Sequence, residues 1–331
     1  MHTLPINPSA PEFLAKGKAS IRNLPVSLFA AVMGLCGLAL CWRLAHRSLA
    51  APAFVGEAIG ALALFVFVLM SVGYVAKLTK YPRAVQAEFL HPMASSFFNT
   101  IAISLLLLST IVAPYSAPAA HALWVVGALA AVVLSFLAIS RLLKGQVDAS
   151  HAVPAWLISG VAPLNIPATG GHMPMAWAAE VSLVGGAIGL VLAFVLFAMI
   201  FSRLVHREPF PLAMTPSLMI LVAPFGVGFL AYIHIVGSVD RCAALLFYFG
   251  LFMFAMVAPK VFRPSVRFSP GWWAIGFPMA ALVNAALRYA DFLASGPLLF
   301  LAGALLSALS LALAILTVRT VKVALSGELF T

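Results

Sequence analysis

Apolar residues gather along this chain into ten runs that are separated by short polar connections. Each run is close to the ~20 residues that an α-helix needs to cross the hydrocarbon core of a bilayer. The runs cover residues 24–45, 54–76, 91–113, 119–141, 153–169, 175–203, 216–236, 241–259, 272–289 and 297–319. This pattern predicts an all-α polytopic membrane protein in which residues 24–322 form one domain of ten transmembrane helices. Residues 1–23 and 323–331 are expected to be short terminal tails.

Proline recurs near the start of every odd-numbered run. The positions are Pro25, Pro92, Pro154, Pro216 and Pro270, which are 67, 62, 62 and 54 residues apart. Proline is well tolerated in the first turn of a helix, because the N–H that it lacks has no partner there. The recurrence predicts that the ten helices are arranged as five helical hairpins.

The odd and even runs differ in the residues that interrupt them. Interior prolines and amide side chains occur only in odd runs, at Pro163, Pro167, Pro224, Pro278, Asn99, Asn165 and Asn284. Broken helices and polar groups at membrane depth need protein or water around them rather than lipid. We therefore expect the five odd helices to form an inner ring around a pore, with these residues as kink and lining candidates, and the even helices to lie outside. The alternative is that the polar groups only form hydrogen bonds between packed helices.

Composition agrees with a membrane protein and excludes several other classes. Of 331 residues, 63% are hydrophobic and 8% are charged, whereas soluble domains carry roughly 25% charged residues. The three cysteines have neither metal-ligand spacing nor the even number of a disulfide framework. The sequence also lacks a phosphate-binding loop and a nucleophile motif, so it predicts no enzyme, no cofactor and no metal site.

Basic residues predict the orientation in the membrane. Fifteen of the 19 Lys and Arg residues lie in the N-terminal tail or in the connections after even runs. Basic residues are retained on the cytoplasmic side, so both termini should be cytoplasmic. This orientation also accounts for most of the net charge of +10, and no nucleic-acid partner is needed to explain it.

The charges in and around the predicted pore favour an anion. All nine acidic residues lie outside the runs or at their edges, whereas cation channels and proton-coupled carriers place carboxylates along the path. Arg43 and Arg47, at the far end of the first helix, have no acidic neighbour within four positions and are candidates for a vestibule, although snorkelling to the interface is the default. Arg288 and Asp291, three residues apart, can pair with each other.

Phe277 is the candidate for a constriction. It directly precedes Pro278 in the ninth run, where a kink would present the ring toward the axis. The alternative is that Phe277 is one more core aromatic residue.

Three stretches carry a resemblance to a known family: residues 88–92, EFLHP, the proline-interrupted fifth run, and residues 272–279, WWAIGFPM. They resemble the family of TehA-like tellurite-resistance proteins and dicarboxylate transporters, which includes the slow anion channels of plant guard cells. The resemblance covers residues 24–322. This sequence departs from many relatives at Met93-Ala94, where they have a valine and a basic residue, and from some at Val32, where they have a proline.

The resemblance implies a homotrimer in a bacterial inner membrane, in which each subunit has its own pore and a phenylalanine that matches Phe277 closes it. Glycines in the sixth run, Gly185, Gly186 and Gly189, would permit close helix contact. We expect a passive channel or uniporter for small inorganic anions such as chloride or nitrate. The partners are then small anions and membrane lipid. The alternative, since the family mixes channels and carriers, is a secondary transporter or exporter of dicarboxylates such as malate, of sulfite or of tellurite.

Overall fold

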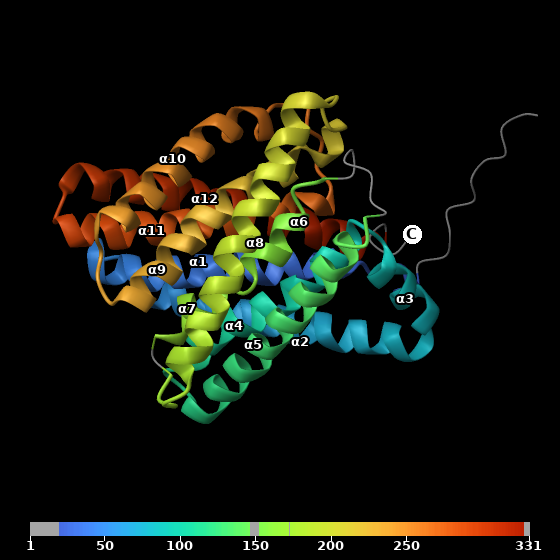
Figure 1. The fold of residues 1–331 in the computed structure, drawn as a ribbon, viewed down its shortest axis with the longest axis horizontal. Coiled ribbons are helices and arrows are strands. Elements are labelled where there is room, and N and C mark those ends of the chain that lie inside the picture. The colour runs from blue at the N-terminus through green and yellow to red at the C-terminus, as the bar shows by residue number, and fades with distance from the viewer. Residues whose placement is uncertain (1–19, 146–151, 172, 328–331) are drawn as a thin grey trace, which may run out of the picture.

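The computed structural model describes residues 20–145, 152–171 and 173–327. Within these ranges the chain forms α-helices and 3-10 helices and no strand, which confirms the all-α class (Figure 1). Most of the predicted N-terminal tail and the last four residues of the C-terminal tail lie outside the described residues.

Eight helical segments among the described residues are long and apolar enough to cross a membrane. They are Val26–Ser48, Ala53–Lys80, Ala94–Val112, Ala117–Leu142, Ala178–His206, Leu212–Val236, Arg241–Val261 and Gly296–Leu325. They correspond to eight of the ten predicted runs. The other two runs are helical but broken. The fifth consists of α6 (Trp156–Val161) and α7 (Asn165–Gly170), and the ninth consists of η6 (Pro270–Ile275) and α11 (Gly276–Leu293).

Four of the odd runs begin as a 3-10 helix and continue as an α-helix. The pairs are η2 (Val26–Leu28) with α1 (Phe29–Ser48), η3 (Ala94–Phe98) with α4 (Asn99–Val112), η5 (Leu212–Val222) with α9 (Ala223–Val236), and η6 with α11. Short 3-10 turns are common at the N-termini of α-helices, but η5 has 11 residues and is much longer than the usual 3–4.

The four predicted interior prolines lie where a missing N–H costs least, but the structure also places Pro216 inside η5 and Pro259 near the end of even helix α10 (Arg241–Val261), so interior prolines are not confined to the odd helices. Pro224 and Pro278 lie in the first turns of α9 and α11, directly after the change from 3-10 to α geometry, and Pro167 lies in the first turn of α7. Pro163 lies in the turn between α6 and α7. The predicted kinks are therefore junctions between helix types and between short helices rather than bends within one α-helix.

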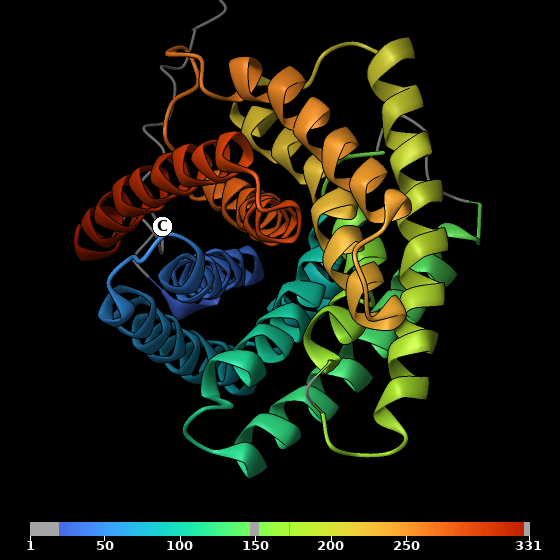
Figure 2. The same cartoon turned by 90° about the vertical axis from the view of Figure 1, so that its left-hand side faces the viewer.

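Burial separates the odd from the even helices. In the membrane-crossing windows of α1, η3–α4 and η5–α9, 67–78% of the residues are buried, compared with 17–33% in the even helices. The even helices are α2 (Ala53–Lys80), α5 (Ala117–Leu142), α8 (Ala178–His206), α10 (Arg241–Val261) and α12 (Gly296–Leu325). Figure 2 shows α8 (yellow-green) and α12 (red) along opposite margins of the bundle. Of the 18 residues of α11, 14 are buried.

Two ion pairs lie at opposite ends of α2, and they join it to α1 and to α3 (Pro82–Leu90). At one end, Arg43 of α1 binds Glu57 of α2 with an Nη2–Oε2 distance of 2.6 Å. At the other end, Lys77 Nζ lies 2.7 Å from Glu88 Oε2 and donates to the carbonyl of Leu24. Glu88 lies in α3, a short helix that the hydrophobic pattern did not predict.

The EFLHP stretch has a structural role at this second end. Glu88 accepts hydrogen bonds from Tyr74 Oη at 2.8 Å and from the backbone N–H of Val26 at 2.7 Å. His91 Nδ1 accepts from the N–H groups of Met93 and Ala94 at the start of η3. The stretch thus fastens the beginnings of the first and third runs to α2 and α3.

Candidate functional site

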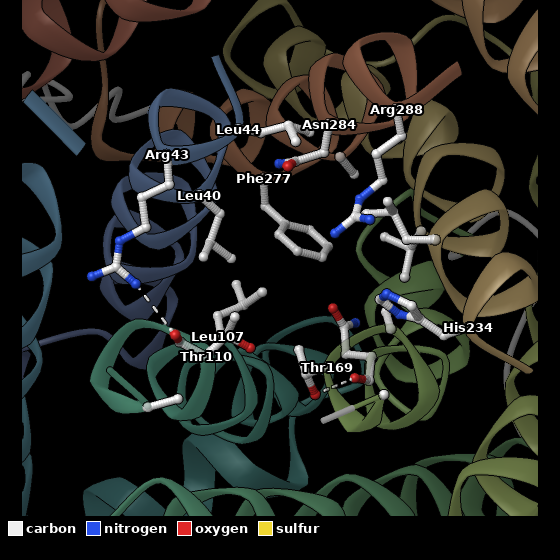
Figure 3. Close-up of a pocket in the computed structure, with 18 of the residues that line it drawn as sticks. Leu40, Arg43, Leu44, Leu107, Thr110, Thr169, His234, Phe277, Asn284 and Arg288 are labelled. Atoms are coloured by element: carbon white, nitrogen blue, oxygen red, sulfur yellow. Dashed lines mark hydrogen bonds between the residues drawn. The ribbon is translucent and has the colours of Figure 1, made fainter. Parts of the chain in front are cut away.

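A cavity of about 310 Å³ opens between the odd helices, and we call it the arginine cavity (Figure 3). Its walls come from α1, α4, α9 and α11, with α7 and the chain just after it supplying the remaining side. Each of the five odd runs thus contributes to one cavity. Its lining includes Arg43, Arg47 and Arg288, and none of the described residues that line it carries a carboxylate.

Phe277 contributes to the walls of two cavities. Its side chain projects into the arginine cavity in Figure 3. It also lines a second cavity of about 20 Å³, which we call the apolar cavity, together with Pro278 and Met33. The other residues of the apolar cavity belong to the first halves of the same five runs, including Phe97, Ile158 and Ile220. Only 6% of the Phe277 surface is exposed. The ring is therefore a wall shared by a cavity with basic side chains and a small apolar one.

Arg288 extends from α11 toward the middle of the arginine cavity, and in Figure 3 its guanidinium lies between Phe277 and His234. Its Nε is buried and has no hydrogen-bond partner in the structure. The expected pairing with Asp291 is absent between these two residues. Asp291 instead accepts a hydrogen bond from Ser48 Oγ. Spacing along the chain predicts a pair between Arg288 and Asp291, whereas the packing of the helices places Arg288 in the cavity.

Arg43 and Arg47 both line the arginine cavity but differ in their partners. Arg43 donates to both carboxylate oxygens of Glu57, at 2.9 and 2.6 Å, and to the carbonyls of Thr110 and Ile111. Glu57 lies 14 residues along the chain, so a search for neighbours within four positions could not find it. Arg47 is exposed and forms no hydrogen bond or ion pair to a described residue.

Tyr115, in the connection after α4, completes the group around Glu57. Its hydroxyl donates to Glu57 Oε2. This hydrogen bond raises the pKa of the Tyr115 phenol above its usual value. The Glu57 carboxylate therefore accepts hydrogen bonds from both Arg43 and Tyr115, and it neutralises the charge of Arg43.

The three predicted amides have different positions. Asn165 and Asn284 line the arginine cavity, whereas Asn99 does not. Asn99 donates to Ser159 Oγ at 3.1 Å and accepts from Ser135 Oγ at 3.3 Å, so it joins α4, α5 and α6. Among the prolines, Pro278 lines the apolar cavity, while Pro163, Pro167 and Pro224 are buried and line neither cavity.

Several polar residues of the site were not predicted. Thr110, Thr169 and His234 line the arginine cavity. His234 Nδ1 lies 3.1 Å from the carbonyl oxygen of Pro167, and Thr169 donates to the carbonyl of Asn165 at 2.7 Å. Threonine is too common in membrane helices for the sequence to distinguish these positions from packing residues.

Comparison with known proteins gives a consistent set of relatives. The profile of a family described as voltage-dependent anion channels matches residues 23–321. An S-type anion channel of Arabidopsis thaliana is 27% identical over 86% of this chain and 79% of its own length. An uncharacterized transporter of Methanocaldococcus jannaschii is 27% identical over 80% of this chain and 84% of its own. A tellurite resistance protein TehA homolog of Haemophilus influenzae is 26% identical, with coverages of 80% and 81%.

Proposed function

The chain belongs to the voltage-dependent anion channel family, and from this premise we propose that it is a passive channel for small inorganic anions such as chloride or nitrate. The path runs between the five odd helices, and Phe277 is its gate. Ten membrane crossings, arranged as five hairpins, form the pore. The five even helices cover it and face lipid or neighbouring subunits.

The observation that carries this proposal is the arginine cavity itself. All five odd runs line it, three arginines face it, and none of the described lining residues is acidic. Basic side chains at the mouth of a low-dielectric cavity raise the local concentration of anions and exclude cations. Such a cavity supports anion transport more directly than any single residue does.

The gate assignment rests on the two cavities that meet at Phe277. A narrow apolar constriction stops ions because it strips them of water without offering charge or hydrogen bonds in return. The phenyl ring lies between a wide cavity with polar walls and a small apolar one. Rotation of the ring away from the axis would join the two spaces.

Passive conduction is favoured over coupled transport by the chemistry of the walls. A carrier that couples anion movement to protons generally uses buried carboxylates or histidines as a relay. The arginine cavity has one histidine, His234, and none of its described lining residues carries a carboxylate. We therefore assign no coupling ion.

A second candidate function is transport or export of dicarboxylates, sulfite or tellurite. The TehA homolog of Haemophilus influenzae is described as a tellurite resistance protein, and the relative from Methanocaldococcus jannaschii as a transporter. A cavity of about 310 Å³ has room for an anion larger than chloride.

The proposed assembly is a homotrimer in a bacterial inner membrane with both termini in the cytoplasm. The large apolar side chains exposed on the even helices, such as Phe136 and Phe194, supply surface for lipid or subunit contact. Gly185 and Gly189 do not add support, because both pack closely on residues 163–166 of the same chain. Mass measurement in mild detergent tests the trimer, and a dimer or monomer would contradict it.

The experiment that tests the transport proposal is a side-by-side flux assay in liposomes with chloride, nitrate, sulfite and malate. The proposal predicts flux of chloride and nitrate down their gradients without a pH gradient. Flux that appears only when a proton gradient is imposed would contradict it and favour the carrier. Saturable exchange restricted to malate or sulfite would have the same consequence.

A further inference from the structure

A third cavity, of about 270 Å³, lies at the other ends of the third and fifth runs, and we call it the serine cavity. The later parts of these two runs line the arginine cavity, whereas their first residues line the serine cavity. The end of α3 and the last turns of α5 supply its other walls. Trp156 Nε1 donates to the carbonyl of Pro92 and Ser159 Oγ accepts from Asn99, so both residues hold the fifth run against the third. The polar lining residues are Ser95, Ser96, Arg141, Lys144, Trp156 and Ser159.

The serine cavity is separate from the proposed conduction path. No described residue lines both the serine cavity and the arginine or apolar cavity. Phe97 and Ile158 line the apolar cavity, whereas Ser96 and Ser159, their neighbours in the chain, line the serine cavity. Consecutive residues of a helix point in directions roughly 100–120° apart, so η3 and α6 present one side to each space. Conduction of anions therefore does not explain the serine cavity.

Two hydroxyl groups of the cavity are available as donors. Only 3% of Ser96 is exposed. The hydroxyls of Thr100, Ser104 and Ser109, further along the same run, all donate to carbonyls of their own run at 2.5–2.7 Å. The side chains of Ser95 and Ser96 form no hydrogen bond to a described residue, although both line the cavity. Because buried hydroxyls in proteins usually have a partner, these two can bind a ligand that offers acceptor atoms.

The cavity also has two cationic side chains, Arg141 and Lys144. Arg141 is held in place by Phe89, because its Nη1 group donates to the carbonyl of that residue and its Cζ atom lies 4.2 Å from the centre of the ring. The other N–H groups of this guanidinium form no hydrogen bond to a described residue. Lys144 is exposed and likewise forms no ion pair within the described part of the chain. None of the described residues that line the serine cavity carries a carboxylate.

We propose that the serine cavity binds a phosphate group through Arg141, Lys144, Ser95 and Ser96. The inference goes beyond the proposed function and does not rest on it. A phosphate group carries several acceptor oxygens, so it can join donors of α5 and η3 at once. Guanidinium groups pair with phosphate through two parallel hydrogen bonds, an ammonium group adds a point charge, and hydroxyls donate to the remaining oxygens.

The phosphate group can belong to a lipid headgroup or to a soluble phosphate compound. Arg141 and Lys144 follow directly on the apolar run of α5, at the level where lipid headgroups lie in a bilayer. Leu90, which lines the cavity, is 59% exposed, and Leu143 is 82% exposed. Basic pockets between membrane helices bind anionic headgroups, and these two leucines supply apolar surface beside the pocket. A soluble phosphate offers the same oxygens without acyl chains.

Binding to the purified protein in detergent separates these sources. Inorganic phosphate, dioctanoyl phosphatidylglycerol and the phosphate-free dioctanoylglycerol are titrated separately at an ionic strength held constant with sodium chloride, and heat release and melting temperature are recorded. Binding of inorganic phosphate would identify a soluble ligand, and binding of the phospholipid alone a headgroup. If neither phosphate compound binds more tightly than dioctanoylglycerol, the inference is overturned. No transport is involved, so the result is independent of the conduction proposal.

Variants locate the bound phosphate, because phosphate salts also stabilise proteins in general. We expect Arg141→Gln to weaken binding of the phosphate compound about tenfold, which corresponds to about 1.4 kcal/mol. Ser96→Ala should weaken it about threefold, because one of several donors is lost. The matched control is Arg241→Gln, since Arg241 is exposed at the start of α10 and lines none of the three cavities. This variant should bind as the wild type does.

Two further variants keep the site falsifiable. If Arg141→Gln fails to fold, Lys144→Gln decides the question, because Lys144 is exposed and is not needed for packing. Binding should weaken about threefold in this variant, and unchanged affinity would overturn the inference. Arg47→Gln tests the arginine cavity, which Arg47 lines. It should leave phosphate binding unchanged, and a loss as large as that of Arg141→Gln would place the phosphate in the arginine cavity and overturn the inference.

Discussion

The inner and outer helices of this protein are both strongly apolar, yet they contact different surroundings. At least two thirds of the residues in the three long inner windows are buried, against at most one third in the outer ones. In a bilayer, lipid is as apolar as a leucine side chain, so hydrophobicity does not draw a helix to the centre. The inner helices are distinguished instead by the amides and by most of the interior prolines, which lipid cannot accommodate. Polar residues within a run, rather than its hydrophobicity, therefore identify the inner helices of this protein.

The inner helices also approach one another more closely than side chains usually allow. A Cβ built on Gly226 of α9 would lie 2.9 Å from backbone atoms of Ala281 and Leu282 in α11. Gly34 of α1 and Gly276 of α11 face each other in a similar way, at 3.0–3.3 Å. Where outer helix α12 carries Gly303, the nearest atom to such a Cβ is a leucine methyl at 3.7 Å. A methyl group is therefore tolerated less at these close contacts between inner helices than at Gly303, although Gly185 and Gly189 of outer helix α8 pack on inner residues just as closely.

The largest expected contrast is between two phenylalanines. Phe229 of inner helix α9 is fully buried, whereas 69% of Phe136 on outer helix α5 is exposed. We expect Phe229→Ala to lower the free energy of unfolding by about 3–5 kcal/mol through the cavity that it leaves. Phe136→Ala should change it by less than about 0.5 kcal/mol. Thermal unfolding in detergent measures both. Equal losses of unfolding free energy in the two variants would contradict the distinction between inner and outer helices.

The next contrast is between the two ion pairs of α2, one with α1 and one with α3. The Glu88 side chain is 15% exposed and that of Glu57 is 41% exposed. Glu88→Gln leaves Lys77 buried without its carboxylate, and breaking such a pair costs about 3 kcal/mol or more. Glu57→Gln affects a pair that is partly in solvent, and we expect a loss of at most about 1 kcal/mol. The melting temperatures of the two variants decide this, and a larger loss for Glu57→Gln would contradict it.

A smaller effect is expected from the glycines. Gly226→Ala forces a methyl group against the backbone of α11 and should destabilise the protein by about 1–3 kcal/mol. Gly303→Ala meets only ordinary contacts and removes a glycine from a helix interior, so it should be neutral or slightly stabilising. If Gly226→Ala melted at or above the wild-type temperature, close packing of α9 on α11 would not be what holds the inner helices together.

The smallest effect concerns Asp240, which caps outer helix α10. Its carboxylate accepts hydrogen bonds from Tyr232 Oη and from the N–H groups of Cys242 and Ala243. These bonds hold the pKa of Asp240 below its usual value. The stabilisation is therefore complete above the unfolded pKa of about 3.9 and is lost as pH falls through the lower folded value. Between pH 5 and pH 2 the melting temperature should fall slightly more for the wild type than for Asp240→Asn. Identical profiles would show that the ionised carboxylate of Asp240 does not stabilise the protein.

The sequence predicts the helical class well because membrane helices consist of long apolar runs. The run at residues 119–141, for example, is α5, Ala117–Leu142. It did not predict α3, since Pro82–Leu90 is short and too polar to resemble a membrane segment. It also represented the ninth run as one kinked helix, whereas the chain changes from 3-10 to α geometry just before Phe277.

The candidate site was only partly predictable, for reasons of distance along the chain. Phe277, Asn165 and Asn284 were found because proline or an amide marks them. Local spacing favours Arg43 over Arg288, because a carboxylate follows Arg288 by three residues, whereas the partner of Arg43, Glu57, lies in the next helix. Partners on other helices cannot be predicted from local spacing. Here they show that Arg43, not Arg288, is paired with a carboxylate.

Anion flux through Phe277→Ala in liposomes is the direct test of whether Phe277 closes a path through the inner helices. Phe229→Ala is the matched control. It removes a ring of equal size from the inner core, and Phe229 lines neither cavity. Phe97 is less suitable because it lines the apolar cavity beside Phe277.

We expect flux well above wild type for Phe277→Ala, an intermediate value for Phe277→Leu, and no increase for Phe229→Ala. Folded Phe277→Ala protein with wild-type flux would contradict the gate assignment and leave Phe277 as a core aromatic residue.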